Sequence, residues 1–209
     1  MKKYLDFKNT IDELKLKKVG KTINKGGLVI FPTETVYGIG TNGLNEKAVE
    51  KLYSIKQRDL NKPISLLVSS IDMVTEIAYD ISDIEYKLMK AFFPGPFTIV
   101  LKKKHIVSDL LTANKDTVGI RMPDCEITQK LIEYSGCPIA APSANISGKP
   151  SGTNVDNFAS DFYDKVDYII DNGESKLGVA STIVQVIDGH PHILRKGSIT
   201  KWQIMQVVL

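Results

Sequence analysis

Two short segments carry side chains suited to binding an anion. Lys56-Gln57-Arg58 supplies two positive charges, and Ser143-Ala144-Asn145 supplies a hydroxyl group and an amide with short hydrogen-bond reach. Each segment lies beside a predicted strand, and ligand sites of open α/β sheets form where loops leave the strand ends. We therefore expect the two segments, although distant in the sequence, to meet and bind phosphate.

Hydrophobic spacing predicts the elements that position these segments. Apolar residues recur at helical spacing after a capping-type Asn45, whereas short continuous apolar runs lie before Ser143 and after Arg58. The predicted strands are 28–31, 64–68, 97–101, 118–120, 139–141, 168–170, 182–187 and 192–194. The predicted helices are 14–24, 45–56, 71–78, 82–93, 126–134, 155–163 and 202–208. This alternation predicts an α/β fold.

Residues 143–154 are small and polar, which favours a long functional loop. Within it, Gly148-Lys149 is followed by Pro150, and Ser143 stands where a Walker A motif requires its first glycine. A Rossmann Gly-x-Gly-x-x-Gly pattern is also absent from the sequence. A nucleotide would therefore have to bind in some other way than through either common phosphate loop.

Composition indicates one compact domain, 1–209. The chain has 209 residues, of which 43% are hydrophobic and 24% are charged, so it can bury a sizeable core. Its apolar stretches are too short to span a bilayer, and its lysine-rich start lacks the apolar part of a signal peptide. We expect a cytoplasmic protein with no membrane partner. Cys125 and Cys137 are read as structural thiols, because neither C-x-x-C spacing nor a histidine cluster is present.

The net charge of +3 is mild. We interpret the lysines at 15, 17, 18 and 21 and the run 102–104 as solvated faces rather than as a dedicated nucleic-acid surface. A sequence pI near 8.7 still permits weak contact with tRNA or other RNA.

An ordered set of short segments also carries a family resemblance. The Lys-x-Arg and Ser-x-Asn pattern at 56–58 and 143–145 resembles that of the YrdC-like threonylcarbamoyl-AMP synthases. The matching segments keep the family's order from about residue 26 to residue 200, and this makes the set far more specific than any one segment. They are residues 31–38, 56–58, 62–63, 93–98, 121–123, 142–148, 181–184 and 194–197.

The resemblance implies a fold and a domain organisation. The expected fold is a single-domain, YrdC-like, twisted mixed sheet flanked by helices, with a large cationic cavity. The chain ends at Leu209, soon after the predicted helix 202–208, and so resembles the short form of the family without an additional C-terminal domain.

The resemblance also implies a reaction. Family members are nucleotidyltransferases that join L-threonine, bicarbonate or CO2, and ATP into L-threonylcarbamoyladenylate and release pyrophosphate. A downstream tRNA threonylcarbamoyl transferase then modifies adenosine 37 of tRNAs that read codons starting with A. We expect Mg2+ to accompany ATP, because it commonly bridges phosphate oxygens, although the sequence assigns no protein ligands to a metal.

Site residues follow from the chemistry of these substrates and from the matched segments. Arg121 ends a predicted strand and offers a planar, permanently charged fork for a carboxylate, which the resemblance makes that of L-threonine. The residues expected to act in catalysis and to bind ATP are Lys56, Arg58, Ser143 and Asn145, with Ser151 and Arg195 added for ATP alone. The residues expected to bind L-threonine are Thr33, Thr35, Tyr37, Arg121 and Ser181.

Other interpretations remain open at this stage. The chain could be an RNA- or nucleotide-binding YrdC-like module without synthase activity, or could share the carbamoyl-adenylate chemistry of hydrogenase-maturation proteins, whose extra regions the sequence lacks. Glu34 could act in catalysis or metal binding, or could only cap a turn or pair with a cation. Ser143 and Asn145 could simply cap the following turn, and Arg195 could be a surface charge on an edge strand.

Overall fold

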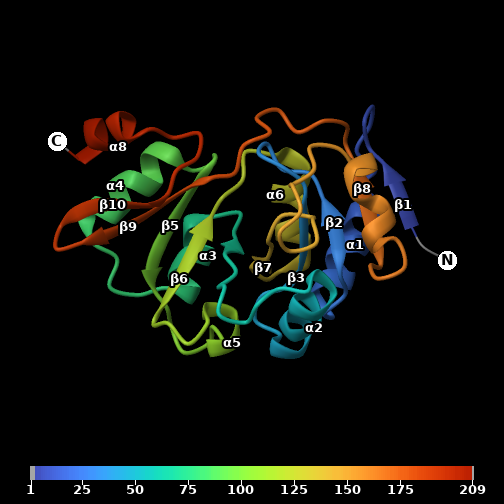
Figure 1. Ribbon diagram of the computed structural model, residues 1–209, viewed down its shortest axis with the longest axis horizontal. Helices are drawn as coiled ribbons and strands as arrows, with labels where there is room; N and C mark the ends of the chain where they lie inside the picture. The colour runs from blue at the N-terminus through green and yellow to red at the C-terminus, as the bar shows by residue number, and fades with distance from the viewer. Residues whose placement is uncertain (1–2, 209) are drawn as a thin grey trace.

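The computed structural model describes residues 3–208, whose strands form one sheet with helices packed against it (Figure 1). The strands are β1 (Lys3–Asp6), β2 (Val29–Phe31), β3 (Gly38–Asn42), β4 (Leu66–Leu67), β5 (Phe97–Lys102), β6 (Thr117–Arg121), β7 (Ile139–Ala140), β8 (Tyr168–Asp171), β9 (Thr182–Ile187) and β10 (His190–Arg195). The helices are α1 (Glu13–Asn24), α2 (Glu46–Lys56), α3 (Ile71–Ile77), α4 (Asp83–Phe92), α5 (Asp109–Thr112), α6 (Glu126–Ser135), the 3₁₀ turn η1 (Val155–Asn157), α7 (Ala159–Phe162) and α8 (Lys201–Val208). No helix in this part of the chain has the length and apolar character needed to cross a bilayer.

The sheet has the strand order β1-β8-β2-β3-β7-β4-β6-β5-β9-β10. Parallel pairs join β8 to β1 and β2, β4 to β6, and β5 to β9, and the other neighbours are antiparallel. The expected fold class, a mixed α/β sheet flanked by helices, is therefore confirmed.

The two halves of the sheet meet at its shortest strands. β7 pairs with β3 through Ile139 and Ala140, and the same two residues pair with Leu66 and Leu67 of β4. In Figure 1, α1, α2 and α6 lie with the half made of β1, β8, β2 and β3, whereas α4, α5 and α8 lie with the half made of β6, β5, β9 and β10. The loops that leave the central strands can therefore reach the space between the two halves.

Two hydrophobic clusters fill the core. The larger one runs beneath both halves and includes Ile39 of β3 and Ile99 of β5. The smaller one packs α1 and α6 against the first half and includes Leu16, Leu131 and Phe31. The helical spacing of Leu16, Val19 and Ile23 gives α1 the apolar face that this packing requires.

All eight predicted strands are present, although most differ at their ends, and 64–68 shortens to Leu66–Leu67. The turn before β10 has positive φ at Asp188 (49°) and Gly189 (76°), the conformation of a tight hairpin.

The predicted helix 155–163 is wrong, because this stretch forms only η1 and the short α7. The sequence also failed to predict β1, β3 and α5. β3 was missed because glycine is disfavoured in strands. Here Gly40 allows close packing, since a Cβ at this position would lie 2.7 Å from Cγ2 of Ile139.

Candidate active site

Lys56 is the last residue of α2, and its side chain forms hydrogen bonds to the 143–154 loop. The helix ends there because Gln57 adopts the left-handed conformation (φ 52°). Lys56 is only 1% exposed, and its Nζ donates hydrogen bonds to the backbone carbonyls of Ser143, at 2.5 Å, and Asn145. The backbone amide of Ser147 donates in return to the carbonyl of Lys56 at 3.0 Å. The ammonium group of Lys56 is therefore buried against backbone carbonyl oxygens of the loop.

Two opposing influences act on the charge of Lys56. Burial, followed by the nearby charge of Arg58, lowers the pKa of the Lys56 ammonium group to about 7. The two carbonyl oxygens act in the other direction, because they accept hydrogen bonds from the charged form. Protonation of Lys56 is thus coupled directly to the position of the 143–154 loop.

The side chains of Ser143 and Asn145 bond within the loop. Ser143 Oγ donates to Asn145 Oδ1, and Asn145 Nδ2 donates to the carbonyl of Lys149 at 2.6 Å. The amide of Ala144 donates to the carbonyl of Tyr37 at 2.7 Å, which joins the loop to the segment before β3. The structure thus brings Lys56, Ser143 and Asn145 together, as the sequence predicted, in a preformed loop.

Ser151 lies farther along the same loop and is exposed. It borders a pocket of about 460 Å³ that also includes Asn145. The remaining lining residues are Lys149, Pro150, Asn157, Phe158, Ser160 and Asp161.

Arg58 follows α2 and turns toward a second pocket. Its Nε and Nη2 donate to the carbonyls of Lys62 (3.1 Å) and Pro63 (2.9 Å), and burial lowers the pKa of its guanidinium group. Pro63 borders a mostly apolar pocket of about 190 Å³ over the central and second-half strands. The other lining residues are Ile64, Ser65, Val100, Lys115, Thr117, Gly119, Ile183, Gln185 and Leu194.

Arg121 ends β6 and forms a buried ion pair with Glu34. Nη2 of Arg121 lies 2.7 Å from Oε2 of Glu34, and the two side chains are 10% and 5% exposed. The geometry does not align a hydrogen bond, so both Glu34 oxygens and Arg121 Nη2 lack a hydrogen-bond partner among the described residues. Nε of Arg121 donates to the carbonyl of Gly95 at 3.3 Å, which fixes the plane of the guanidinium group. Of the alternatives left open for Glu34, pairing with a cation is therefore observed.

Arg195 at the end of β10 folds back onto Ser181. Its Nη2 donates to the carbonyl (2.9 Å) and to Oγ (3.0 Å) of Ser181, whose hydroxyl also lies 2.7 Å from Oγ1 of Thr98. Burial, followed by the charges of Arg121 and Arg58, lowers the pKa of Arg195. The charge of Arg195 is therefore influenced by two other guanidinium groups that come from different parts of the sequence.

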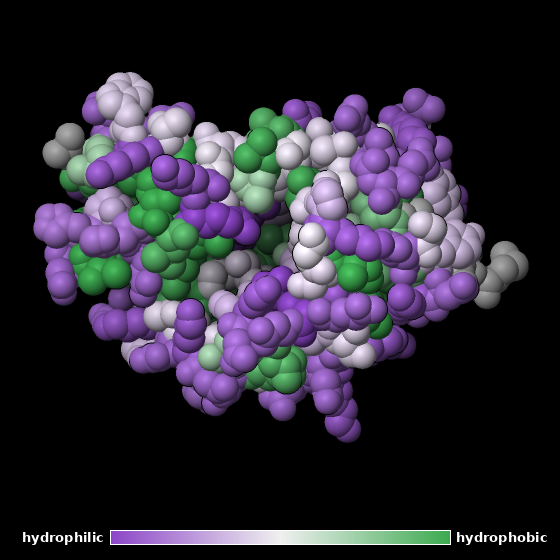
Figure 2. Space-filling view, in the orientation of Figure 1, coloured by the Kyte–Doolittle hydropathy of each residue, from purple (hydrophilic) through white to green (hydrophobic). Residues whose placement is uncertain are grey.

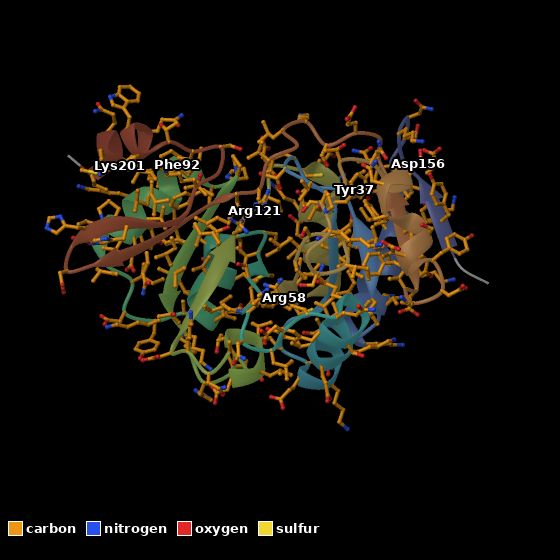
Figure 3. The ribbon with its side chains drawn as sticks, viewed as in Figure 1. Tyr37, Arg58, Phe92, Arg121, Asp156 and Lys201 are labelled. Carbon is orange, nitrogen blue, oxygen red and sulfur yellow. The ribbon has the colours of Figure 1, made fainter. Side chains whose placement is uncertain are left out.

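Two of these guanidinium groups lie near the middle of the molecule. Figure 3 shows Arg121 and Arg58 there, with Arg121 above Arg58 in this view. The space-filling view is hollowed at this place, with hydrophilic residues around an apolar floor (Figure 2).

The threonines at 33 and 35 are buried and bonded to each other. Oγ1 of Thr33 donates to the carbonyl of Val36 at 2.6 Å, which uses its single hydrogen. In the 2.8 Å contact between the two hydroxyl groups, Thr35 must therefore be the donor. Thr35 is left with hydrogen-bond acceptor capacity only.

Tyr37 is fully buried, and its hydroxyl group is used inside the fold. The hydroxyl donates to the carbonyl of Gly173 at 2.7 Å and accepts from the amide of Asn172 at 3.0 Å. It also lies 3.4 Å from the carboxylate of Asp171, which accepts a further bond from Tyr4. Tyr37 thus anchors the segment that leaves β8, and that segment continues to Ser181.

The described residues contain no group of three His, Cys, Asp or Glu side chains that could hold a metal ion. Cys125 and Cys137 are both free thiols.

Sequence reasoning missed three features of the site. Thr98, which bonds to Ser181, lay within a segment quoted for the family resemblance and could have been proposed. Asp171 and the apolar pocket beside Pro63 gave no signal, because both depend on how distant strands pair.

Taken together, the mixed sheet, the central hollow and the nearby guanidinium groups describe an α/β protein with a candidate site for an anionic ligand between its two halves. The model of the Sua5/YciO/YrdC family, described as "Telomere recombination", matches residues 21–197. The chain belongs to this family, which confirms the resemblance read from the sequence.

Named relatives extend this result. A threonylcarbamoyl-AMP synthase from Pyrococcus abyssi is 43% identical over 204 residues, which are 98% of this chain and 60% of the relative. A threonylcarbamoyl-AMP synthase from Bacillus subtilis is 39% identical over 208 residues, 97% of this chain and 60% of that protein. The chain thus spans about 60% of the length of these relatives.

A crystal structure of P. abyssi Sua5 complexed with L-threonine has the same fold. It superimposes with a TM-score of 0.94 at 43% identity, and the match covers 98% of this chain and 60% of that one.

Proposed function

We propose that this chain is an L-threonylcarbamoyladenylate synthase, which forms threonylcarbamoyl-AMP and pyrophosphate from L-threonine, bicarbonate or CO2, and ATP. The observation that carries the proposal is that Arg58, Arg121 and Arg195 lie near enough for the charges of the first two to lower the pKa of Arg195, while among the described residues only Arg121 of the three forms an ion pair with a carboxylate. Such a site has one end with excess positive charge and another that is electrically balanced. This division suits a triphosphate beside an amino acid.

The nucleotide would occupy the positively charged end. The apolar pocket bordered by Pro63 has the character of a site for a nucleobase, which is flat and mostly apolar. The guanidinium groups of Arg58 and Arg195 would face the phosphates, as would the 143–154 loop with Ser143, Asn145 and Ser151. In this arrangement Lys56 stabilises the loop from behind, and the loop contacts the phosphates.

L-threonine would occupy the Arg121 end. The guanidinium group of Arg121 can bind the carboxylate, because its Nε is held by Gly95 while other N–H groups stay available. Thr35 offers only an acceptor, and Ser181 contributes a hydroxyl group at the boundary with Arg195. Tyr37, by contrast, would act indirectly, through the segment that leads from β8 to Ser181.

The chemistry requires no covalent protein intermediate. The amine of threonine takes up CO2 and loses a proton to give a carbamate. A carbamate oxygen then attacks the α-phosphorus of ATP, and pyrophosphate leaves with the electrons of the broken P–O bond. Holding the reactants in line can contribute roughly 7 to 11 kcal/mol to lowering the barrier, and fixed positive charges stabilise the phosphates further. The side chains of this site therefore act by binding and orienting.

Mg2+ would enter this site with the nucleotide. The proposed phosphate ligands are arginine, serine and asparagine side chains, and residues 3–208 contain no group of three His, Cys, Asp or Glu side chains that could hold a metal ion. A magnesium ion here would be held mainly by phosphate oxygens and water, with hydroxyl or amide oxygens of the loop as additional ligands. It would supply charge neutralisation on the phosphates.

The product is a reactive mixed anhydride that needs an acceptor. We propose that a tRNA threonylcarbamoyl transferase uses it to modify adenosine 37, and that any contact of this chain with tRNA is weak and electrostatic.

The test is pyrophosphate release from purified protein with ATP, Mg2+, bicarbonate and L-threonine, repeated with each component omitted. The proposal predicts release only when L-threonine and bicarbonate are both present. ATP binding without such release would refute the synthase and favour the alternative, an RNA- or nucleotide-binding module. The variant Arg121→Gln provides a matched check, because it should abolish threonine-dependent release while ATP still binds.

A further inference from the structure

Glu34 is a buried carboxylate whose hydrogen bonds are missing. Its side chain is 5% exposed, and both of its oxygens lack a hydrogen-bond donor among the described residues. Buried polar atoms in folded proteins nearly always have a partner, so an unpartnered carboxylate at a proposed binding site calls for an explanation. The backbone of Glu34 is fixed independently, since its carbonyl accepts from the amide of Leu177 at 2.9 Å.

The ion pair with Arg121 does not supply this explanation. It provides an opposite charge at 2.7 Å, but Arg121 Nη2 is itself among the buried atoms without a hydrogen bond. An ionised carboxylate offers about four acceptor sites, and a purely structural pair would align into the bidentate geometry that arginine favours. The observed pair leaves N–H donors of Arg121 and carboxylate acceptors of Glu34 unused.

A zwitterion satisfies both sets of groups at once. Its carboxylate can accept the free N–H groups of Arg121, and its ammonium group has three donors for Glu34 and for the acceptor-only Thr35. None of the residues that the sequence assigned to either substrate is acidic, so Glu34 adds the negative charge that those sets lack.

We propose that Glu34 is a specificity-determining residue, which binds the ammonium group of the amino-acid substrate and so selects a zwitterion over a simple carboxylate. This inference rests on the proposed function, because it names the recognition of the same amino acid. It assigns Glu34 to binding only, and no proton transfer to this carboxylate is required.

The experiment measures binding by calorimetry with two ligands, L-threonine and (R)-3-hydroxybutanoate, which is threonine with a hydrogen atom in place of the amino group. Wild-type protein should bind L-threonine at least about tenfold more tightly, as expected for a charge-assisted hydrogen bond. In Glu34→Gln this preference should fall to less than about threefold, mainly because L-threonine binds more weakly. Glu34→Asp, which keeps the charge, should retain part of the preference.

The matched control is Glu174→Gln. Glu174 is an exposed carboxylate whose Oε1 accepts a bond from Thr153, and removal of its charge should leave the preference unchanged. Equal weakening of both ligands in Glu34→Gln would overturn the inference, since that is the effect of a residue that only supports Arg121. A wild-type preference below about threefold would also overturn it, even if the variant failed to fold.

The two proposals fail in different ways. If the wild-type protein binds L-threonine and (R)-3-hydroxybutanoate equally well but releases pyrophosphate only with L-threonine, only the role of Glu34 is overturned. Amine-dependent binding without pyrophosphate release overturns only the synthase activity.

Discussion

Replacement of Lys56 by methionine tests whether a buried ammonium group stabilises the 143–154 loop. Methionine keeps the length and apolar part of the side chain but removes both hydrogen bonds to the carbonyls of Ser143 and Asn145. We expect nucleotide affinity to fall at least about tenfold, because the loop that would contact the phosphates loses its attachment to α2. Lys51→Met, on an exposed position of the same helix, is the matched control.

The effect on stability should be much smaller, because two terms oppose each other. Hydrogen bonds from a charged donor contribute about 1.5 to 3 kcal/mol each, so the loss of two costs about 3 to 6 kcal/mol. The lowering of the pKa from 10.5 to about 7 corresponds to a cost of about 4 to 5 kcal/mol for keeping Lys56 charged at pH 7, and methionine removes that cost. The free energy of unfolding at pH 7 should therefore change by only a few kcal/mol, in contrast to the loss of nucleotide binding.

The pH dependence isolates the second of these terms. Between about pH 7 and 10.5 the unfolded chain keeps the Lys56 proton while the folded chain loses it, so the wild-type unfolding free energy should rise with pH relative to Lys56→Met. The difference should grow by up to about 1.4 kcal/mol per pH unit. Urea denaturation of both proteins at pH 7, 8 and 9 measures it. Parallel curves would refute the reasoning and would mean that the two carbonyl oxygens hold the Lys56 pKa near its ordinary value.

Two further predictions concern the frame around the site. Tyr37→Phe removes the hydroxyl group that bonds to Gly173, and it should speed amide hydrogen exchange in the segment that leaves β8 by about five- to tenfold without unfolding the chain. Tyr4→Phe, on the outer side of Asp171, is the control and should leave this exchange unchanged. Equal exchange rates in the two variants would contradict the anchoring role of Tyr37. Gly40→Ala should destabilise the protein by roughly 1 to 3 kcal/mol in urea denaturation, because the added Cβ would lie 2.7 Å from Cγ2 of Ile139, and an unchanged midpoint would mean that β7 can shift.

Much of the fold was predictable because local patterns agree with the tertiary structure. The apolar runs that became β5 and β6 are mostly buried on the sheet, and the spacing in α2 put Ala48, Val49 and Leu52 on its buried face. β1 and β3 were not predictable in this way. β1 acquires its partner only from β8, far along the chain, and β3 uses glycines whose value lies in close packing rather than in local preference.

The sequence predicted which residues belong to the site better than it predicted the contacts that they make. The meeting of Lys56 with the Ser143 segment could be predicted because each segment lies beside a predicted strand of one sheet. The direction of the Lys56 ammonium group did not follow, because it depends on where backbone carbonyls of a distant loop end up. The same holds for Tyr37, which was expected to bind L-threonine but whose hydroxyl group bonds to the carbonyl of Gly173. Glu34 lay within a recognisable segment, yet only the structure reveals that its carboxylate oxygens have no donors.

The strand order has a consequence for how the chain acquires its structure. β8 lies between β1 and β2, so these two early strands can pair with it only after a much later part of the chain has been synthesised. β9 likewise completes the second half by pairing with β5. Because such non-local pairings close long loops, folding should be slow compared with a helical protein of this size. A nascent chain on the ribosome therefore cannot complete one half of the sheet before the other. Both halves should become protected from hydrogen exchange together, once β8 and β9 have emerged.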